Sequence, residues 1–193
     1  GLAIDAIQNA QKKGLKVSCS TSPHYFSLDE TDIKKWRTFA KLSPPLRDKK
    51  NLAYVKRGIL NNVITCITSD HSPHDTDSKR LPFEIASPGS IGFESLLPLT
   101  LNLIKEKKLG FLKLIELIST NPAKLLNLNA GSLKIGNNAD IVLFDPNSKI
   151  KLSSELIKSK SKNFPYENKP AFGKIYLTMV DGKIIFKNGK FSI

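Results

Sequence analysis

The chain has 193 residues, 40% of them hydrophobic, and a formal net charge of +13. This length suits one well-filled core, or one domain with a small appendage. No apolar run approaches the ~18 residues of a membrane span, and the first residues lack the order of a signal peptide. We therefore expect a soluble, cytoplasmic protein with no membrane partner.

The positive charge alone would suit a nucleic-acid-binding protein. However, only four of the 30 basic residues are arginines, which base recognition favours, and no run of lysines exceeds two residues. The densest cluster alternates lysine and serine over residues 158–162. Because a lysine-coated surface usually serves solubility, we expect no nucleic-acid partner.

The first predicted elements are a helix and a strand. Apolar residues at helical spacing predict a helix over 3–13, and Gly14 supplies its C-terminal stop. Apolar residues then alternate over 15–19, as in a strand. Cys19 and Cys66 both fall in predicted strands, which favours buried, reduced thiols over a disulfide.

A second helix and strand follow the first pair. A polar, weakly helical segment over 29–39 leads to the break at Pro44, beyond which Asp48 can cap a helix to about residue 60. A run rich in β-branched residues over 63–68 predicts the next strand. The order helix, strand, helix, strand favours parallel strands joined by crossover helices.

The middle of the chain combines a long loop with helices. Residues 71–90 hold three prolines and show no periodicity, as in a lid or a binding loop. Helices are predicted over 93–107 and 111–119, and Asn121 with the following proline predicts a short capped helix.

The C-terminal third predicts short antiparallel strands. Residues 133–136 and 140–144 have strand-like patterns, and three more strands are predicted over 175–193. The dipeptides Asp181-Gly182 and Asn188-Gly189 are typical of tight hairpins, whose positive φ angles suit those residues. We therefore predict two domains, 1–128 and 129–193, the second with an irregular loop over 158–173.

The strongest chemical signal is the cluster of Asp70, His71 and His74 directly after the predicted strand 63–68. Catalytic groups gather at the carboxyl ends of parallel strands, where the scaffold holds them rigidly. His24 follows the preceding strand, so the two clusters can meet at one sheet edge. A lone histidine beside a proline can equally be structural, and both interpretations of His24 stay open.

Two further stretches are weaker candidates. The segment 43–47, Ser-Pro-Pro-Leu-Arg, is either a substrate contact or a rigid turn with a surface arginine. The segment 87–89, Ser-Pro-Gly, offers backbone donors, because glycine allows a ligand to approach closely.

Taken together, these stretches resemble the cyclic amidohydrolases of the amidohydrolase superfamily, and the dihydroorotase family most of all. The resemblance covers essentially the whole chain. The stretches that carry it, in chain order, are 14–17, 23–24, 42–47, 68–74, 81–84, 92–99, 121–124, 131–133, 136–142 and 180–183.

The resemblance implies an α/β fold, namely the second half of a metal-dependent (β/α)8 TIM barrel plus a small C-terminal β-sandwich unit. A whole barrel needs about 250 residues, so a half fits this length. The family holds two zinc ions through a His-x-His pair, a bridging carboxylate or carbamylated lysine and two single histidines, and none of these matches a residue here. The one ligand that this chain retains is the final carboxylate, which Asp70 matches. We therefore expect that the chain alone does not fully bind zinc, and that the missing ligands would precede Gly1.

The resemblance also implies roles for individual residues. Asp70 matches the last zinc ligand and the general acid/base of the family, and His74 matches a substrate-binding histidine. Pro88 and Gly89 match positions that contact the substrate. Ser43 stands where many family members have a substrate-binding asparagine, and a hydroxyl cannot make the paired contacts of an amide. His24 matches no ligand, so we assign it to the surroundings of the site.

The leading hypothesis is a dihydroorotase fragment, inactive alone, from an enzyme that reversibly cyclises N-carbamoyl-aspartate to dihydroorotate in pyrimidine biosynthesis. One alternative is a hydantoinase or allantoinase, although these generally lack a match to His74. Another is a noncatalytic remnant or assembly partner. The resemblance implies a small-molecule substrate and, as candidate protein partners, a separate N-terminal half, further copies of the chain or aspartate transcarbamoylase.

Overall fold

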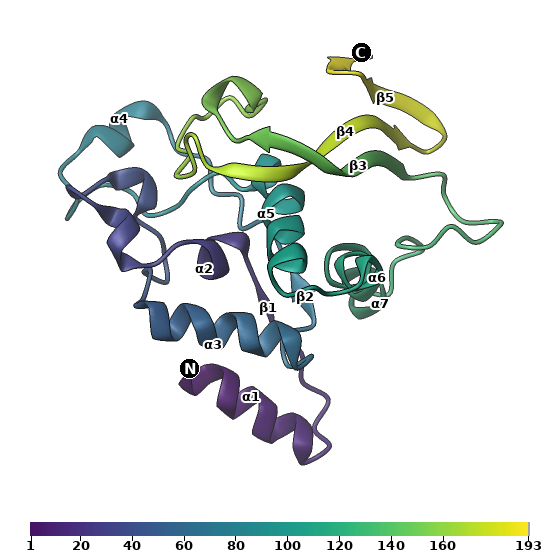
Figure 1. The fold of residues 1–193 in the computed structure, drawn as a ribbon, viewed down its shortest axis with the longest axis horizontal. Helices are drawn as coiled ribbons and strands as arrows, with labels where there is room; N and C mark the ends of the chain where they lie inside the picture. Colours follow the sequence, from purple (N-terminus) through teal and green to yellow (C-terminus); the bar gives the residue numbers. More distant parts are fainter. Residues whose placement is uncertain (193) are drawn as a thin grey trace. The chain divides into compact units, whose positions relative to one another are not determined.

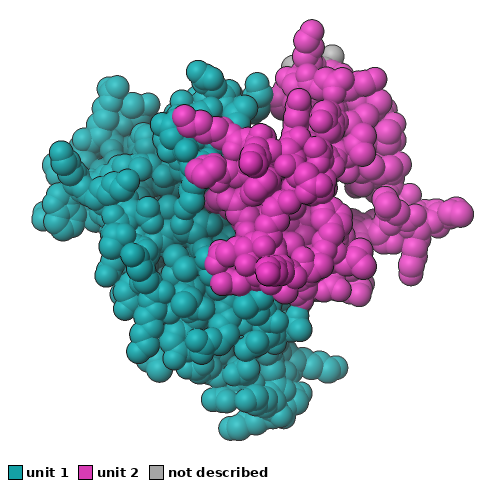
Figure 2. Space-filling view, viewed as in Figure 1, with its two compact units in different colours: residues 1–96, 152–169 teal, residues 97–151, 170–193 magenta. Residues whose placement is uncertain are grey.

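A computed structural model describes residues 1–192, and the chain divides into two compact units (Figure 2). Unit 1 holds Gly1–Leu96 and Leu152–Lys169, and unit 2 holds Leu97–Lys151 and the stretch from Pro170 onward. The division differs from the predicted domain border after residue 128. Unit 2 begins before that border, at Leu97, and the segment Leu152–Lys169 beyond it belongs to unit 1. The border itself stays a prediction.

Unit 1 is built on a parallel pair of short strands, β1 (Ser20–Thr21) and β2 (Cys66–Ile67) (Figure 1). The expected parallel pairing is confirmed, but the strands predicted over 15–19 and 63–68 are much shorter. Residues 15–18 are exposed and pair with no other strand among residues 1–192. Alternating apolar residues therefore did not suffice to make a ladder there.

The helices of unit 1 flank this pair. Helix α1 (Leu2–Lys12) lies beside α3 (Lys49–Leu60), as Figure 1 shows. The predicted cap of α3 is confirmed, since a carboxylate oxygen of Asp48 accepts a hydrogen bond from the Asn51 amide at 2.8 Å. The cap satisfies one of the amides that the first turn leaves without a helical partner.

Short helical turns fill the segments between the strands. They are α2 (Pro23–Ser27), η1 (Glu30–Ile33), η2 (Thr38–Ala40) and α4 (Thr76–Arg80). A further turn, η4 (Ser154–Leu156), lies in the segment Leu152–Lys169, which also belongs to unit 1. Helix α4 corrects the expectation of an irregular loop over 71–90. Asp75 caps it by accepting from the Ser78 amide at 2.8 Å, a start signal that the sequence carries.

Three helical segments form a nearly continuous stretch in unit 2, after α5 (Phe93–Glu106). They are α6 (Phe111–Ile115), the π-helical turn η3 (Glu116–Thr120) and α7 (Asn121–Leu125). A short helix begins at Asn121 with Pro122 in its first turn, as predicted. Asn121 does not cap it, however, because the preceding Thr120 already has helical dihedral angles and the chain runs on. The wider turn accommodates Pro122, which lacks an N–H and would crowd a regular helix.

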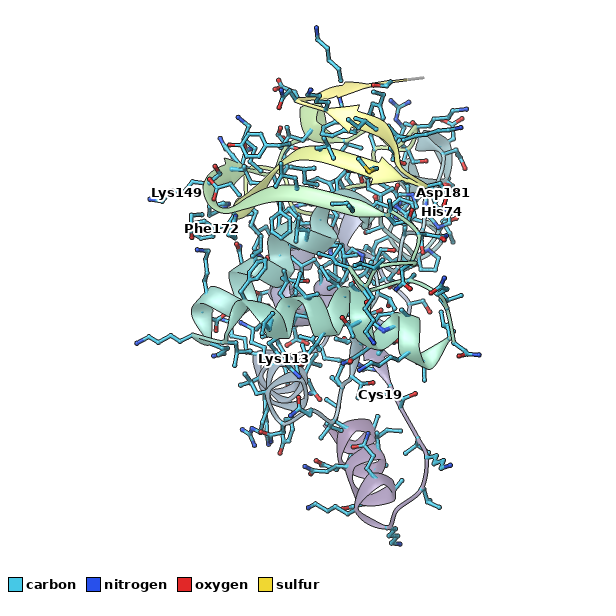
Figure 3. The ribbon with its side chains drawn as sticks, turned by 90° about the vertical axis from the view of Figure 1, so that its right-hand side faces the viewer. Cys19, His74, Lys113, Lys149, Phe172 and Asp181 are labelled. Carbon is cyan, nitrogen blue, oxygen red and sulfur yellow. The ribbon has the colours of Figure 1, made fainter. Side chains whose placement is uncertain are left out.

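The rest of unit 2 is an antiparallel sheet in chain order: β3 (Ile141–Lys151), β4 (Pro170–Val180), β5 (Lys183–Lys187) and β6 (Lys190–Phe191). Lys149 and Phe172 pair across β3 and β4 and lie at the same end of these strands (Figure 3). The predicted antiparallel unit is confirmed.

Both predicted hairpin turns are confirmed. All four turn residues have positive φ, 47° and 75° at Asp181 and Gly182, and 46° and 87° at Asn188 and Gly189. The strand predicted over 133–136 is wrong, since within residues 1–192 this segment has no strand partner and its apolar side chains are exposed.

Each unit has its own buried side chains. Unit 1 buries Phe26, Ile59, Ile67, Ile91 and Tyr166, and unit 2 buries Leu99, Leu101, Leu103, Leu114 and Leu117. Both cysteines are free thiols, as predicted, but only Cys66 is buried, and Cys19 is half-buried. No helix within residues 1–192 is long and apolar enough to cross a bilayer.

Candidate functional site

The parallel strand pair brings the two predicted clusters to one edge of unit 1. Backbone hydrogen bonds from Thr65 N to Cys19 O (3.1 Å) and from Thr68 N to Thr21 O (2.9 Å) extend the pairing beyond the ladder. The chain therefore leaves both strands at the same end, towards His24 and towards Asp70. This is the juxtaposition that the order of elements predicts.

Asp70 stands at this edge in an uncommon backbone conformation. Its φ is 50°, in the left-handed region that few residues other than glycine, asparagine and aspartate adopt. Its side chain is exposed and makes no hydrogen bond or ion pair with any residue in the described part of the chain. The carboxylate is thus available to a ligand or a proton.

His71 has a structural role. Its Nδ1 accepts hydrogen bonds from the amides of Gly92 (3.2 Å) and Phe93 (3.4 Å), and its ring stacks on Phe93 at 3.8 Å between centroids. Gly92 must be glycine, because a Cβ there would lie 2.0 Å from the Ser69 carbonyl oxygen. These contacts fix the backbone next to Asp70 against the start of α5.

Three of the predicted substrate residues form one group, which we call the loop group: His74, Pro88 and Gly89. His74 Nε2 lies 2.9 Å from the Pro88 carbonyl oxygen. Gly89 has a φ of 133°, and a Cβ on it would lie 2.7 Å from Ser72 Cβ and 2.8 Å from His74 Nε2. Only glycine fits there, so the imidazole and the turn 88–89 are held face to face.

The backbone of this turn is already hydrogen-bonded within the chain. Pro88 has no N–H, and the Gly89 amide donates to the Lys41 carbonyl at 2.8 Å. The Gly89 carbonyl accepts from Lys79 Nζ at 3.0 Å and from Asn163 Nδ2 at 3.1 Å. The expected backbone donors are therefore engaged, and the Pro88 oxygen is the polar atom of this turn that keeps a lone pair for a ligand.

Sequence reasoning missed Lys79 and Asn163. Lys79 is only 3% exposed, and burial lowers the pKa of its amino group to about 8, with the nearby charge of Lys41 as a second cause. The capping aspartate of α4 could have indicated that Lys79 lies on a helix. Asn163 directly follows the lysine-rich stretch 158–162, and no local signal distinguishes it.

Ser43 remains apart from the loop group. It is exposed before α3, and within residues 1–192 no hydrogen bond joins it to His74, Pro88 or Gly89. The neighbouring Pro44 carbonyl accepts from the Tyr25 hydroxyl at 2.9 Å. Burial raises the pKa of this tyrosine to about 12, and the charge of Asp70 adds to the shift. The Ser43 turn is thereby tied to the residue after His24.

His24 is fully buried. Its Nδ1 lies 2.6 Å from the Tyr166 hydroxyl, and its Nε2 is also buried. Burial lowers its pKa to about 4, although the nearby charge of Asp70 acts in the opposite direction. A neutral, enclosed imidazole suits the assignment of His24 to the surroundings of the site.

The described residues do not fit a complete metal centre. Within residues 1–192, no group of three or more His, Cys, Asp and Glu side chains is placed to hold a metal ion. A catalytic zinc usually needs three protein ligands, and Asp70 offers one carboxylate. Any metal centre would require ligands from outside these residues.

Comparison with known proteins agrees with this incomplete site. Residues 6–185 match the model of the Amidohydrolase family. The chain is 39% identical over 185 residues to the dihydroorotase of Geotalea daltonii, covering 96% of this chain and 44% of the relative. It is 42% identical over 184 residues to the dihydroorotase of Trichlorobacter lovleyi, covering 95% and 43%. The chain thus spans less than half the length of these relatives.

Solved structures show the same partial match. A dihydropyrimidinase from Brevibacillus agri NCHU1002 superposes with a TM-score of 0.91 at 27% identity, over 98% of this chain and 43% of that one. The L-hydantoinase (dihydropyrimidinase) of Arthrobacter aurescens gives the same TM-score and identity over 98% and 44%. Sequence and structure together show that this chain belongs to the amidohydrolase family.

Proposed function

We propose that the chain is the C-terminal part of a dihydroorotase, which reversibly cyclises N-carbamoyl-aspartate to dihydroorotate in pyrimidine biosynthesis. The observation that carries this proposal is an exposed, unpartnered Asp70 carboxylate that follows a strand four residues before His74 of the loop group. The identity of about 40% to proteins named dihydroorotase supports it. In this proposal unit 1 contributes to a partial TIM barrel, and the sheet of unit 2 to a β-sandwich.

Asp70 would be the general acid/base. In hydrolysis, water adds to the ring carbonyl carbon, the carbon–nitrogen bond breaks, and Asp70 passes the proton of the water to the leaving nitrogen. Zinc in the whole protein would lower the pKa of water, with Asp70 as one ligand and the others from the region that this chain does not cover. The exposed, unpartnered Asp70 side chain suits a group that must gain and lose a proton.

The loop group would bind the substrate. Since a carbonyl only accepts, His74 Nε2 carries the proton that it shares with Pro88 O. Its Nδ1 would then be the ring nitrogen that contacts the substrate. Pro88 O and Gly89 would form the neighbouring wall, and the Ser43 hydroxyl would add one contact.

A second candidate is a hydantoinase-type enzyme, which the match to a dihydropyrimidinase and an L-hydantoinase favours. The two candidates differ in the ring that they open, because dihydroorotate carries a carboxylate and hydantoin does not. Hydantoinases and allantoinases generally lack a match to His74, so this residue favours dihydroorotate. A noncatalytic assembly partner is the third candidate.

The test uses the full-length protein that contains this chain, assayed with dihydroorotate and with hydantoin. We expect turnover of dihydroorotate, and His74→Ala should reduce it by about ten- to a hundredfold through loss of a polar substrate contact. Preferential opening of hydantoin would favour the second candidate, and no turnover of either would favour the third. Unchanged turnover of dihydroorotate in His74→Ala would refute the assignment of His74.

The chain alone provides a complementary measurement. We expect no dihydroorotase activity and no binuclear zinc centre, because the residues present offer one carboxylate ligand. Adding a separately produced N-terminal region should restore turnover if the two parts assemble. Two zinc ions per chain together with turnover, without that region, would contradict the proposed division of the site.

A further inference from the structure

We propose that Asn163, supported by Lys79, is a positioning residue that fixes the loop group for substrate binding. The test of this inference has two arms. The activity arm, which measures turnover of substrate, rests on the proposed function. The structural arm, which measures hydrogen exchange, does not, because the contacts of Asn163 can be tested in a protein of any activity.

Asn163 joins two loop segments, and both of them are far from Asn163 in the chain. Its amide nitrogen donates to the Ser72 carbonyl at 2.9 Å and to the Gly89 carbonyl at 3.1 Å. These carbonyls lie 91 and 74 residues away from Asn163 in the sequence. One side chain thus connects the segment that carries His74 to the turn that carries Gly89.

Asn163 is itself held firmly. Its side chain is 2% exposed, and its backbone carbonyl accepts from the Ile91 amide at 3.2 Å. A buried carbonyl that loses its donor keeps the full penalty of desolvation. Without this amide, the Ser72 carbonyl would lose the donor described here, and the Gly89 carbonyl would lose one of two donors. Aspartate has the same shape but no N–H to donate, and would place a carboxylate against two carbonyls.

Lys79 supports the same turn from α4. Its amino group donates to the Ser87 carbonyl at 2.7 Å and to the Gly89 carbonyl at 3.0 Å. Both lone pairs of the Gly89 oxygen are therefore used, one by Lys79 and one by Asn163. The Gly89 peptide cannot rotate without breaking these bonds, and His74 packs against that glycine.

The activity arm compares Asn163→Ala and Asn163→Asp with the wild-type full-length protein. A mispositioned loop group should raise the KM for dihydroorotate about tenfold, consistent with the loss of one or two buried hydrogen bonds, and change kcat less than about threefold. A merely stabilising role would lower the melting temperature and the active fraction, and leave KM unchanged.

Asn102→Ala is the matched control. Asn102 also donates its side-chain amide to a backbone carbonyl, that of Pro170 at 3.0 Å, but within unit 2. We expect its KM to equal that of the wild type. An Asn163→Asp variant with wild-type KM would overturn the donor role of the amide.

The structural arm measures amide hydrogen exchange in the same full-length variants. In Asn163→Asp, peptides covering 71–75 and 87–92 should both exchange faster than in the wild type, whereas Asn102→Ala should leave both unchanged. Unchanged exchange, or faster exchange in only one of the two segments, would overturn the inference. If the wild type does not hydrolyse dihydroorotate, the proposed function fails and this arm still decides on Asn163. If Asn163→Ala does not fold, Lys79→Met should show the same exchange pattern over 87–92.

Discussion

Asp70 and the loop group lie within twenty residues of each other, yet they differ in how completely the chain surrounds them. The Asp70 carboxylate is exposed and has no partner among residues 1–192, whereas the polar atoms of 88–89 are almost all bonded within unit 1. The contacts of the loop group are therefore made within unit 1. Under the proposed function, these residues bind substrate, and the proton transfer assigned to Asp70 needs further groups from outside this chain.

Asp70→Asn in the full-length protein should give the largest change in activity. Losing a general acid/base costs about 10²- to 10⁴-fold in turnover, so we expect a loss of at least about 100-fold. Stability should hardly change, because Asp70 is exposed and asparagine tolerates a φ of 50°. Turnover and thermal unfolding together check this, and a variant that loses both equally would contradict an open, purely catalytic Asp70.

Gly89→Ala should instead affect stability. A Cβ at a φ of 133°, with Ser72 Cβ 2.7 Å away, should lower the free energy of unfolding of the full-length protein by roughly 1–3 kcal/mol. Urea unfolding measures the loss. Gly110→Ala is the control, because its Cβ meets nothing within 4 Å. Equal losses in the two variants would mean that the loop group is less closely packed than the distances indicate.

Lys79 should give an effect of another kind, a dependence of stability on pH. Burial lowers its pKa from 10.5 to about 8, so between these values the unfolded chain holds a proton that the folded chain has released. Stability therefore rises with pH through this window. The difference in unfolding free energy between wild type and Lys79→Met should increase from pH 8 to 10.5. A flat difference would mean that Lys79 titrates normally.

Local chemistry explains what could be predicted from the sequence. The Asp48 cap and the Asp181-Gly182 and Asn188-Gly189 turns were predicted because residues close in the chain determine them. The parallel pairing of β1 and β2 followed from the order of elements. The strand predicted over 133–136 was wrong because an alternating pattern cannot supply a neighbouring strand. The capping role of Asn121 was wrong because the π-helical turn η3 leads directly into α7.

The residues of the candidate site show the same contrast between local and long-range signals. Asp70, His74, Pro88 and Gly89 could be predicted as site residues because short, contiguous motifs carry them and the family resemblance rests on these motifs. Asn163 and Lys79 could not be found so, because their roles come from carbonyls that only the folded chain brings near them. In the sequence, Asn163 and Lys79 look like ordinary surface residues, and only their burial distinguishes them.

The return of Leu152–Lys169 to unit 1 has a consequence for synthesis on the ribosome. The buried pair of His24 and Tyr166 spans 142 residues, and the segment that holds Tyr166 also delivers Asn163. Contacts so distant in sequence form late, because a long loop must close before they contribute any stability. Unit 1 therefore completes its core only when most of this chain has been translated, and until then its loop carbonyls and apolar side chains stay open to chaperones and to other nascent chains.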